Sequence, residues 1–424
     1  MTVTRSSLLR KFLYAYALLS PLGNFARLSQ NEGSYGITTI LLVFIALVAF
    51  PFAFKVILRQ PTLRAFGFLI LWVFLASALA LDPLNAFGNS ASLFIYLLAS
   101  SAAFCSLFDD DHIVKLLTAF ALGGCLGAIA TLVDFTGLID LPGINENIAA
   151  TRTEVGYIMQ VSGPFARRSA MAAYYTMIIS IGILLPIYNN RLKLSAKFFF
   201  LFSSMVCSVS LALTHNRAGI LSAAMAVLVC LIFSSSNLIF LIQKLCVLVF
   251  LGMLFLAALN TLFPDAMLVY QSFLEPSEAY ATIGFLQLSE SDALRITFFQ
   301  HTMSSLLENP IGHGYSLLTG VSGYEDFPVD PHGNLTQIVW ASGLFGVLWL
   351  LLFGSRAVVQ SLRLIRTKLT LEPISRLIPT LIGALLSFLI LGVSHTVIST
   401  GIAWILCGSL LRLIKEKKLS SLQN

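Results

Sequence analysis

The sequence contains few charged residues. Asp, Glu, Lys and Arg make up 11% of its 424 residues, whereas 57% are hydrophobic. A soluble domain has about 25% charged residues, so this scarcity excludes a chain that buries its apolar residues only in its own core. Apolar runs recur along the whole sequence, and each approaches the roughly 20 residues needed to cross a bilayer. The composition therefore predicts a polytopic membrane protein.

The sequence also lacks the motifs of several kinds of site. Its six cysteines lie inside or beside apolar runs. That position is typical of small core residues, and the spacing fits neither a disulfide framework nor a zinc site. There is no phosphate-binding P-loop and no Ser-centred turn of the kind found in hydrolases. We therefore expect no metal and no cofactor.

We predict an all-α fold with about 12 transmembrane helices. The expected spans are 8–25, 37–54, 66–81, 91–108, 113–133, 169–187, 198–213, 218–233, 246–263, 334–354, 377–394 and 397–412. Two of the connections are long, 134–168 and 264–333. The chain thus divides into a first membrane part (1–263), a long loop with an amphipathic helix (264–333), and a second membrane part with a basic tail (334–424).

Basic residues are distributed unequally between the two sides of the predicted membrane. With the N-terminus in the cytoplasm, the outer side keeps only Arg27, Arg152, Arg167, Arg168, Arg217 and Arg295 of the 26 Lys and Arg residues. Cytoplasmic loops carry the excess of Lys and Arg in membrane proteins. The distribution therefore places both long loops outside, and it explains the net charge of +6 without a nucleic-acid partner.

Three predicted spans begin on the outer side next to conspicuous polar residues. Arg167 and Arg168 precede one span, Arg217 precedes another, and His332 precedes a third. An Arg at a helix N-terminus is locally unfavourable because the helix dipole is already positive there. Free N–H groups and a guanidinium nevertheless make a good phosphate site. A single such Arg is most often an ordinary snorkelling residue, but several on one face favour a diphosphate clamp.

His332 has two interpretations. A lone His before a span is most often a capping or interface residue. Next to Asp330, however, His332 also fits an oriented general base with a pKa near the working pH. The spacing alone leaves both interpretations open.

The long loop contains a predicted helix from Asp292 to Glu308, with Asp292 as its N-cap and Pro310 beyond its end. Its apolar face is formed by Leu294, Phe298, Phe299, Thr302 and Leu306. We expect this helix to lie along the membrane surface and cover a site. It carries Arg295, the only Lys or Arg between 264 and 333. Arg295 is therefore either a third phosphate contact or one partner of an internal salt bridge.

These residues lie in segments that resemble the bacterial O-antigen ligase family, which includes related polymerases. The most specific match is 332–337 with 343–346, which resembles the family's His-Asn-x-x-Leu-Gln followed by Gly-Leu-x-Gly, with Gly333 inserted. Residues 214–219 resemble its Ser-Arg-Gly helix start, although His215 and Asn216 replace small residues.

Two further segments carry the same resemblance. Arg295 followed by residues 309–314 is similar to the family's Arg and Asn-Pro-Leu-Gly-Val-Gly run, with His313 in place of an apolar residue. Residues 163–165 are a weaker match. The matches together cover residues 163–346, and the first five spans resemble the family only in hydropathy.

The resemblance implies a glycosyltransferase of type C architecture, with a long, partly helical periplasmic loop, in the bacterial inner membrane. Family members transfer a glycan from undecaprenyl diphosphate to an acceptor, which is lipid A–core for the ligases, and they need no metal. A single inverting displacement is implied, with membrane lipids around the site. His332 would accept the proton of the acceptor hydroxyl, while Arg168 (or Arg167), Arg217 and Arg295 would bind the diphosphate.

Two other functions remain open at this point. An O-antigen polymerase would use the same donor with a second carrier-linked glycan as acceptor, and the spacing of Arg152 and Gly163 resembles some polymerase loops. A flippase or transporter would carry ionisable residues near the middle of the membrane and show broken, repeated helices. The sequence has almost no charge inside its predicted spans, which favours an enzyme at the membrane face.

Overall fold

The computed structural model describes residues 3–26, 36–141, 144, 149–153, 156–165, 168–214, 216–235, 238–262, 281–283, 286–288, 290–321, 329, 331–367 and 376–420. The helices are α1 (Val3–Leu19), α2 (Ile37–Arg59), α3 (Pro61–Ala76), α4 (Pro83–Ser106), α5 (Asp110–Phe135), α6 (Arg168–Tyr188), α7 (Leu194–Leu213), α8 (Arg217–Ser234), α9 (Leu238–Leu262), α11 (Glu290–Glu308), α12 (Asn334–Trp349), α13 (Ser355–Thr367), α14 (Leu377–Ser394) and α15 (Gly401–Ser420). The strands are β1 (Ala149–Thr153), β2 (Gly156–Gln160), β3 (Ala281–Ile283) and β4 (Leu286–Leu288).

The protein is a helical, multi-pass membrane protein. Within the described residues, nine helices are long and apolar enough to cross a membrane: α2 to α8, α14, and α12 together with its continuation to Leu364. Every predicted span overlaps a helix, and α1, α9 and α15 overlap the other three predicted spans. The helical architecture expected from the apolar runs is thus confirmed.

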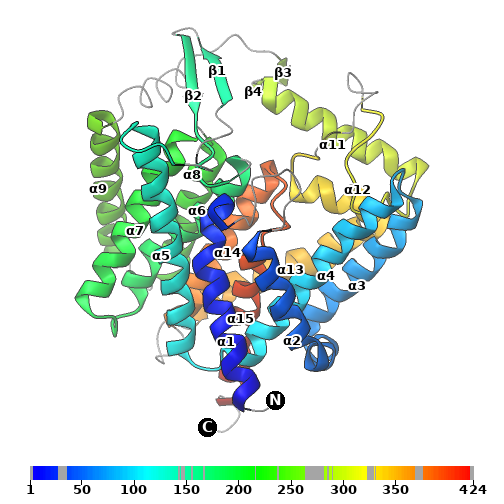
Figure 1. The fold of residues 1–424 in the computed structure, drawn as a ribbon, viewed down its shortest axis with the longest axis horizontal. Coiled ribbons are helices and arrows are strands. Elements are labelled where there is room, and N and C mark those ends of the chain that lie inside the picture. The colour runs from blue at the N-terminus through cyan, green and yellow to red at the C-terminus, as the bar shows by residue number, and fades with distance from the viewer. Residues whose placement is uncertain are drawn as a thin grey trace.

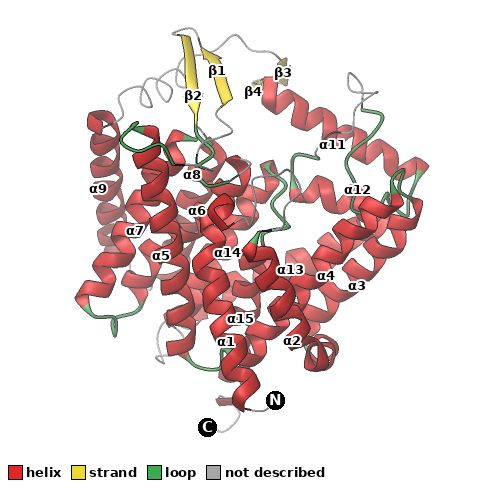
Figure 2. Ribbon diagram, viewed as in Figure 1, coloured by secondary structure: helices red, strands yellow, loops and turns green. Residues whose placement is uncertain are grey.

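The helices form one bundle with two distinct ends. Both termini lie at one end, which we call the inner end (Figure 1). The hairpins β1–β2 and β3–β4 and helix α11 lie at the opposite end, which we call the outer end (Figures 1 and 2). The described parts of the two long connections thus lie at the same end, away from α1's start and α15's end, as the charge distribution predicts.

Helix α14 lies at the centre of the packing that supports the outer end. It packs against α6 and α8, and it also contacts α12 and α15. Twelve of its residues are buried, among them Thr380 and Ser387. Small residues permit this close approach: a Cβ on Gly383 would lie 2.2 Å from Leu184 of α6, and one on Gly392 would lie 2.3 Å from the amide of Asn334.

Helix α4 begins eight residues before the predicted start at 91. Asp82 caps it by accepting a hydrogen bond from the backbone N–H of Asn85 at 3.2 Å. Its first turns carry polar side chains that are paired inside the protein; Ser90, for example, is fully buried and lies 2.9 Å from the hydroxyl of Ser77. The hydropathy pattern missed these turns because it counts polar residues as unfavourable in the membrane. Polar side chains that form hydrogen bonds inside the protein pay little free energy for leaving water.

The long connections differ from the prediction in two details. Each carries a short antiparallel hairpin. The strands are too short to show the alternation of apolar and polar residues that predicts a strand. The loop helix α11 begins at Glu290, so the prediction that Asp292 is its N-cap is wrong. Its buried face is formed by Phe298, Thr302 and Ser305, while Phe299 is 45% exposed. Phe299 therefore does not belong to the face that packs on the protein.

Helix α12 is kinked at Gly343, where φ is 59° and ψ is −141°. Beyond Trp349 it continues as a π-helical turn, Leu350–Gly354. Positive φ is accessible to glycine at little cost, and π-turns often accompany functional sites. The kink lies within the second half of the most specific family-like segment.

Candidate functional site

His332 lies directly before α12 in an unusual backbone conformation. Its φ is 48°, the only positive φ of a non-glycine residue among those described, and its side chain is exposed. Few residues other than glycine adopt this region, although His does so more often than bulky residues. Such conformations persist when surrounding contacts impose them, and they are frequent at active sites.

The chain around His332 is held by the loop that joins α14 to α15. The backbone N–H of Gly333 donates to the hydroxyl of Thr396 at 3.1 Å. The side-chain oxygen of Asn334 accepts hydrogen bonds from the backbone N–H groups of Val397 and Ile398, at 2.8 and 2.9 Å. A Cβ on Gly333 would lie 2.8 Å from the carbonyl oxygen of Val393. The inserted glycine therefore allows the chain to pass α14 closely at this point.

The imidazole of His332 stacks on the phenyl ring of Phe298 in α11. The ring centres are 5.3 Å apart and the planes differ by 7°. Phe298 is 2% exposed and belongs to a small cluster with Leu318, Val321 and Trp340. A rigid ring below the imidazole limits its rotation, so α11 determines which way the exposed edge of His332 faces.

Arg295 lies on α11, three residues before Phe298, and is half-buried. Residues three apart lie on neighbouring positions of one helix face. The ring stack between Phe298 and His332 therefore brings the face that carries Arg295 to the start of α12. Of the predicted site residues, Arg295 and His332 are thus connected through Phe298.

The two family-like segments of the C-terminal half pack directly against each other. The backbone N–H of Gly314 donates to the carbonyl of Ala341 at 3.0 Å, and that of Leu344 donates to the carbonyl of Pro310 at 2.9 Å. A Cβ on Gly343 would lie 2.2 Å from the carbonyl oxygen of Pro310, and one on Gly312 would lie 2.6 Å from the nitrogen of Gly343. The glycines of both segments are thus required by a single contact that fixes the kink of α12.

His313 is a half-buried residue that the sequence left without a role. Its ring stacks on Trp340 with centres 3.9 Å apart, and its Nε2 is buried without a hydrogen-bond partner. Burial lowers the pKa of His313, the nearby His301 lowers it further, and Glu308 acts in the opposite direction. His301 also contacts Trp340, and its Nε2 lies 2.9 Å from the carbonyl of Thr319. We assign both histidines a structural role, because they pack α11 and the segment after it against Trp340 of α12.

Arg168 and Arg217 lie on two helix starts that touch each other. A Cβ on Gly219 of α8 would lie 3.3 Å from the Cβ of Ala172 of α6, so the first turns are in contact. Asn216 caps α8 by accepting a hydrogen bond from the N–H of Gly219 at 3.0 Å. Arg168 is half-buried and Arg217 is exposed. Two cations and two positive dipole ends therefore lie side by side.

The segment before α6 is tightly placed. Gly163 has a φ of 58°, and a Cβ there would lie 2.8 Å from the hydroxyl of Thr131. The strand β2, at the outer end, leads through this turn into α6, so the start of α6 is also at that end (Figure 1). Arg167, Asp330 and His215, which the sequence also singled out, lie outside the described residues.

Two pairs of predicted site residues thus lie at the outer end, Arg168 with Arg217 and His332 with Arg295. Helix α14 connects them, because it packs against α6 and α8 along its length and meets Asn334 at its last turn. No group of three or more metal-binding side chains occurs within the described residues. The arrangement offers cations and an imidazole, which suit an anion and a proton transfer.

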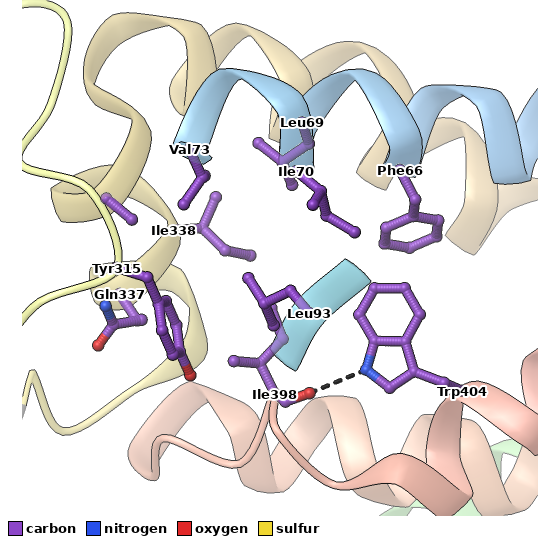
Figure 3. A pocket seen from close by; sticks show the side chains of 11 residues that line it. Phe66, Leu69, Ile70, Val73, Leu93, Tyr315, Gln337, Ile338, Ile398 and Trp404 are labelled. Atoms are coloured by element: carbon purple, nitrogen blue, oxygen red, sulfur yellow. Dashed lines mark hydrogen bonds between the residues drawn. The ribbon is translucent and has the colours of Figure 1, made fainter. Parts of the chain in front are cut away.

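The cavity below the start of α12 is apolar. It is lined by α3, α4, α12, α15 and the segment after α11, with Tyr315 and Gln337 near one end and Trp404 at the other (Figure 3). Trp404 donates its indole N–H to the carbonyl of Ile398 at 2.9 Å. A diphosphate would lose its hydration in such a space without compensation. This cavity is therefore unsuited to an anion.

A comparison of the chain with models of known protein families finds no match. A comparison with curated proteins finds none either.

Proposed function

We propose that this protein is a glycosyltransferase of the O-antigen ligase type. It moves a glycan from undecaprenyl diphosphate to lipid A–core at the periplasmic face of the bacterial inner membrane. The observation that carries the proposal is the contact between the family-like segments 309–314 and 332–346, which sets His332 against the helix that bears Arg295. This contact supports the proposal because it brings the family-like segments into one region of the fold.

The proposed topology has twelve spans with both termini in the cytoplasm. The nine apolar helices would be joined by α1, α9 and α15, which coincide with the other predicted spans. An even number of crossings agrees with two termini at the inner end (Figure 1). The outer end then faces the periplasm, where the donor presents its glycan.

The proposed chemistry is a single displacement at the anomeric carbon. The acceptor hydroxyl attacks this carbon while a ring nitrogen of His332 takes the hydroxyl proton. The bond between the anomeric carbon and the phosphate oxygen breaks, and its electron pair leaves with undecaprenyl diphosphate. Attack opposite to the leaving group inverts the anomeric centre. General-base assistance of this kind contributes roughly 10²- to 10⁴-fold.

The arginines stabilise the leaving group in this scheme. Negative charge on the diphosphate grows as the bond breaks, and fixed cations aimed at growing charge lower the barrier. Arg168 and Arg217 bind it together with the N–H groups of their helix starts, and Arg295 approaches from α11. Arg167 is the alternative to Arg168 on the same turn.

The carrier's long hydrocarbon chain needs a lipid-facing surface near this site. A groove between α3 and α12 offers one, lined by Leu71, Trp72, Phe345 and Phe353 among others. Trp72 donates its indole N–H to the carbonyls of Ile311 and Ser342, both at 3.1 Å. The groove therefore adjoins the contact that fixes the kink in α12.

The test is a transfer assay with purified protein in liposomes. Carrier-linked glycan and lipid A–core are supplied, and glycosylated lipid A–core and free undecaprenyl diphosphate are measured. The proposal expects both products in equal amounts. Glycan that crosses the liposome without cleavage would instead identify a flippase and contradict the proposal.

The acceptor is decided by complementation. Cells without a ligase make lipid-linked polymer and bare core, whereas cells without a polymerase add a single repeat to the core. The proposal expects rescue of the first phenotype and not of the second. The opposite outcome would assign the site to a polymerase.

A further inference from the structure

Helix α11 carries a second apolar face beside the one that packs on the protein. Phe299, Met303 and Leu307 recur every four residues, which places them on one side of the helix. They are 45, 39 and 90% exposed. The buried Phe298 and the exposed Phe299 therefore belong to different faces, although they are neighbours in the sequence.

The third face of α11 is polar. Gln300, Ser304 and Glu308 each follow one of the three apolar residues, and all three are exposed. Successive residues of a helix differ in direction by about 100°, so α11 presents an apolar side and a polar side to its surroundings. A helix that lies along a lipid surface buries such an apolar side at the level of the headgroups and keeps the polar side in water.

The connection between α3 and α4 exposes further apolar residues at the outer end. Leu81 and Leu84 are 84 and 85% exposed, and Leu79 is 54% exposed. Single exposed apolar side chains are ordinary on a soluble surface, whereas a contiguous patch marks a contact with a partner or a membrane.

The segment after α11 brings these two sets of residues into one region. Trp72 of α3 donates its indole N–H to the carbonyl of Ile311 at 3.1 Å, and a Cβ on Gly314 would lie 2.4 Å from the Cα of Ser77. Ile311 is itself 44% exposed, and Figure 1 shows α11 running towards the outer ends of α3 and α4. We call the combined surface the outer ridge, and it consists of Leu79, Leu81, Leu84, Phe299, Met303, Leu307 and Ile311.

The outer ridge continues a surface that faces lipid. The segment Pro61–Leu79 is long and apolar enough to cross a membrane, and its residues Leu71 and Leu75 are 56 and 59% exposed. Between Leu75 and Leu81 the only polar residue is Ser77, which is fully buried. The exposed apolar surface of the span therefore passes into the ridge without a polar interruption.

We propose that the outer ridge inserts into the outer leaflet of the membrane, so that α11 lies along the boundary between lipid and water. Its apolar side chains then lie about 5–10 Å into the boundary between headgroups and acyl chains, while its polar side stays in water. The continuity with Pro61–Leu79 favours lipid over a second copy of the chain as the occupant. The inference rests on exposure and helix geometry, so it does not depend on the proposed transfer reaction.

The experiment measures the depth of single side chains in full-length protein in lipid nanodiscs. A genetically encoded fluorescent amino acid replaces Leu307 in one variant and Glu308 in another, and its emission is quenched by brominated phospholipids or by iodide in water. The label at position 307 is expected to be quenched by the lipids, protected from iodide, and placed about 5–10 Å into the boundary between headgroups and acyl chains. The label at position 308 is expected to show the opposite preference.

A second matched pair lies one turn earlier on α11. A label in place of Met303 is expected to be quenched by lipid, and one in place of Ser304 by iodide. The members of each pair are neighbours, so a difference between them reports the side of the helix and not its overall position. A label in place of Leu81 is expected at the same depth as that at 307, because both belong to the outer ridge. Size-exclusion chromatography checks that each labelled protein is folded.

Three results would overturn the proposal. Equal quenching by iodide at positions 307 and 308 would show that both sides of α11 lie in water. Protection of position 307 from both quenchers would show that protein covers the ridge, and two chains in each nanodisc would identify the cover as a second copy. Quenching by lipid at position 307 but not at 81 would show that the two segments do not form one inserted surface.

Discussion

The two ends of the bundle hold their cations in opposite ways. At the inner end, Arg412 and Lys415 of α15 lie over the ring of Phe104, whose face attracts positive charge. At the outer end, Arg168 and Arg217 are the first residues of α6 and α8, where the helix dipole repels positive charge. The inner cations lie against an aromatic face, whereas the outer ones lie at helix starts whose free N–H groups also favour an anion.

The largest expected effect is at His332, because no other described residue combines an imidazole, an exposed edge and an imposed backbone conformation. His332→Ala should lower the rate of glycan transfer by about 10²- to 10⁴-fold while leaving insertion and thermal stability unchanged. The transfer assay measures the rate, and size-exclusion chromatography checks the fold. Parental turnover in the folded variant would remove the base from the mechanism.

Loss of an outer arginine should have the next largest effect. Arg217→Ala should slow transfer by about two to three decades, since one such contact supplies roughly 2–4 kcal/mol to the transition state. Arg217→Lys should recover only part of the rate, because Lys keeps the charge but loses the two-pronged geometry. Full activity of the Lys variant would show that Arg217 acts only through its charge and not through paired hydrogen bonds to the diphosphate.

The stack on His332 should matter less than either charge. Phe298→Ala removes a ring contact that is worth about 0.5–1.5 kcal/mol, so transfer should fall roughly 2- to 12-fold and its pH profile should shift. Phe299→Ala is the control, because that neighbouring ring is exposed. A positioning role predicts that Phe298→Tyr restores the profile; a change in stability alone would leave the profile in place.

The smallest expected effect concerns His313, which follows α11 in the chain and stacks on Trp340 of α12. Because burial lowers the pKa of His313, the unfolded chain binds a proton before the folded protein does. Stability should therefore fall as the pH drops below about 6.5 and be unaffected above it. His313→Leu should flatten this acid-side loss in a thermal melt between pH 7 and pH 5. A wild-type melting temperature that stays constant over this range would contradict the assignment.

The helices were predictable because lipid requires apolar runs of a defined length. The predicted spans overlap all nine apolar helices that the structure describes as long enough to cross a membrane. Several ends differ; α4 begins earlier than predicted because polar side chains of its first turns are paired internally, as at Ser90 beside Ser77. The sequence also predicted α11, since a run of apolar residues at helical spacing is readable without tertiary contacts. The hairpins were not predictable, because three- or five-residue strands leave no such pattern.

The candidate site was predictable only in its parts. The unfavourable position of an Arg at a helix start singled out Arg168 and Arg217, and the motif singled out His332. That Phe298 lies under His332, or that Gly312 meets Gly343, depends on chain segments 30 residues or more apart. Such contacts follow from packing geometry, which a single sequence does not encode locally. For the contact between Gly312 and Gly343, the sequence offered one signal. It is the pair of glycines in Asn-Pro-x-Gly-x-Gly, both of which have a positive φ in the structure.

The most direct test of the account is equilibrium binding of undecaprenyl diphosphate, without glycan, to the protein in nanodiscs. Arg168→Ala/Arg217→Ala should weaken binding at least about 10²-fold, since each charged hydrogen bond contributes roughly 1.5–3 kcal/mol. His332→Ala should bind as the parent does, and so should Arg191→Ala, which changes an exposed residue in the loop between α6 and α7, at the far end of α6 from Arg168. Unchanged affinity in the Arg168/Arg217 double variant, or an equal loss in Arg191→Ala, would contradict the claim that the outer helix starts hold the diphosphate.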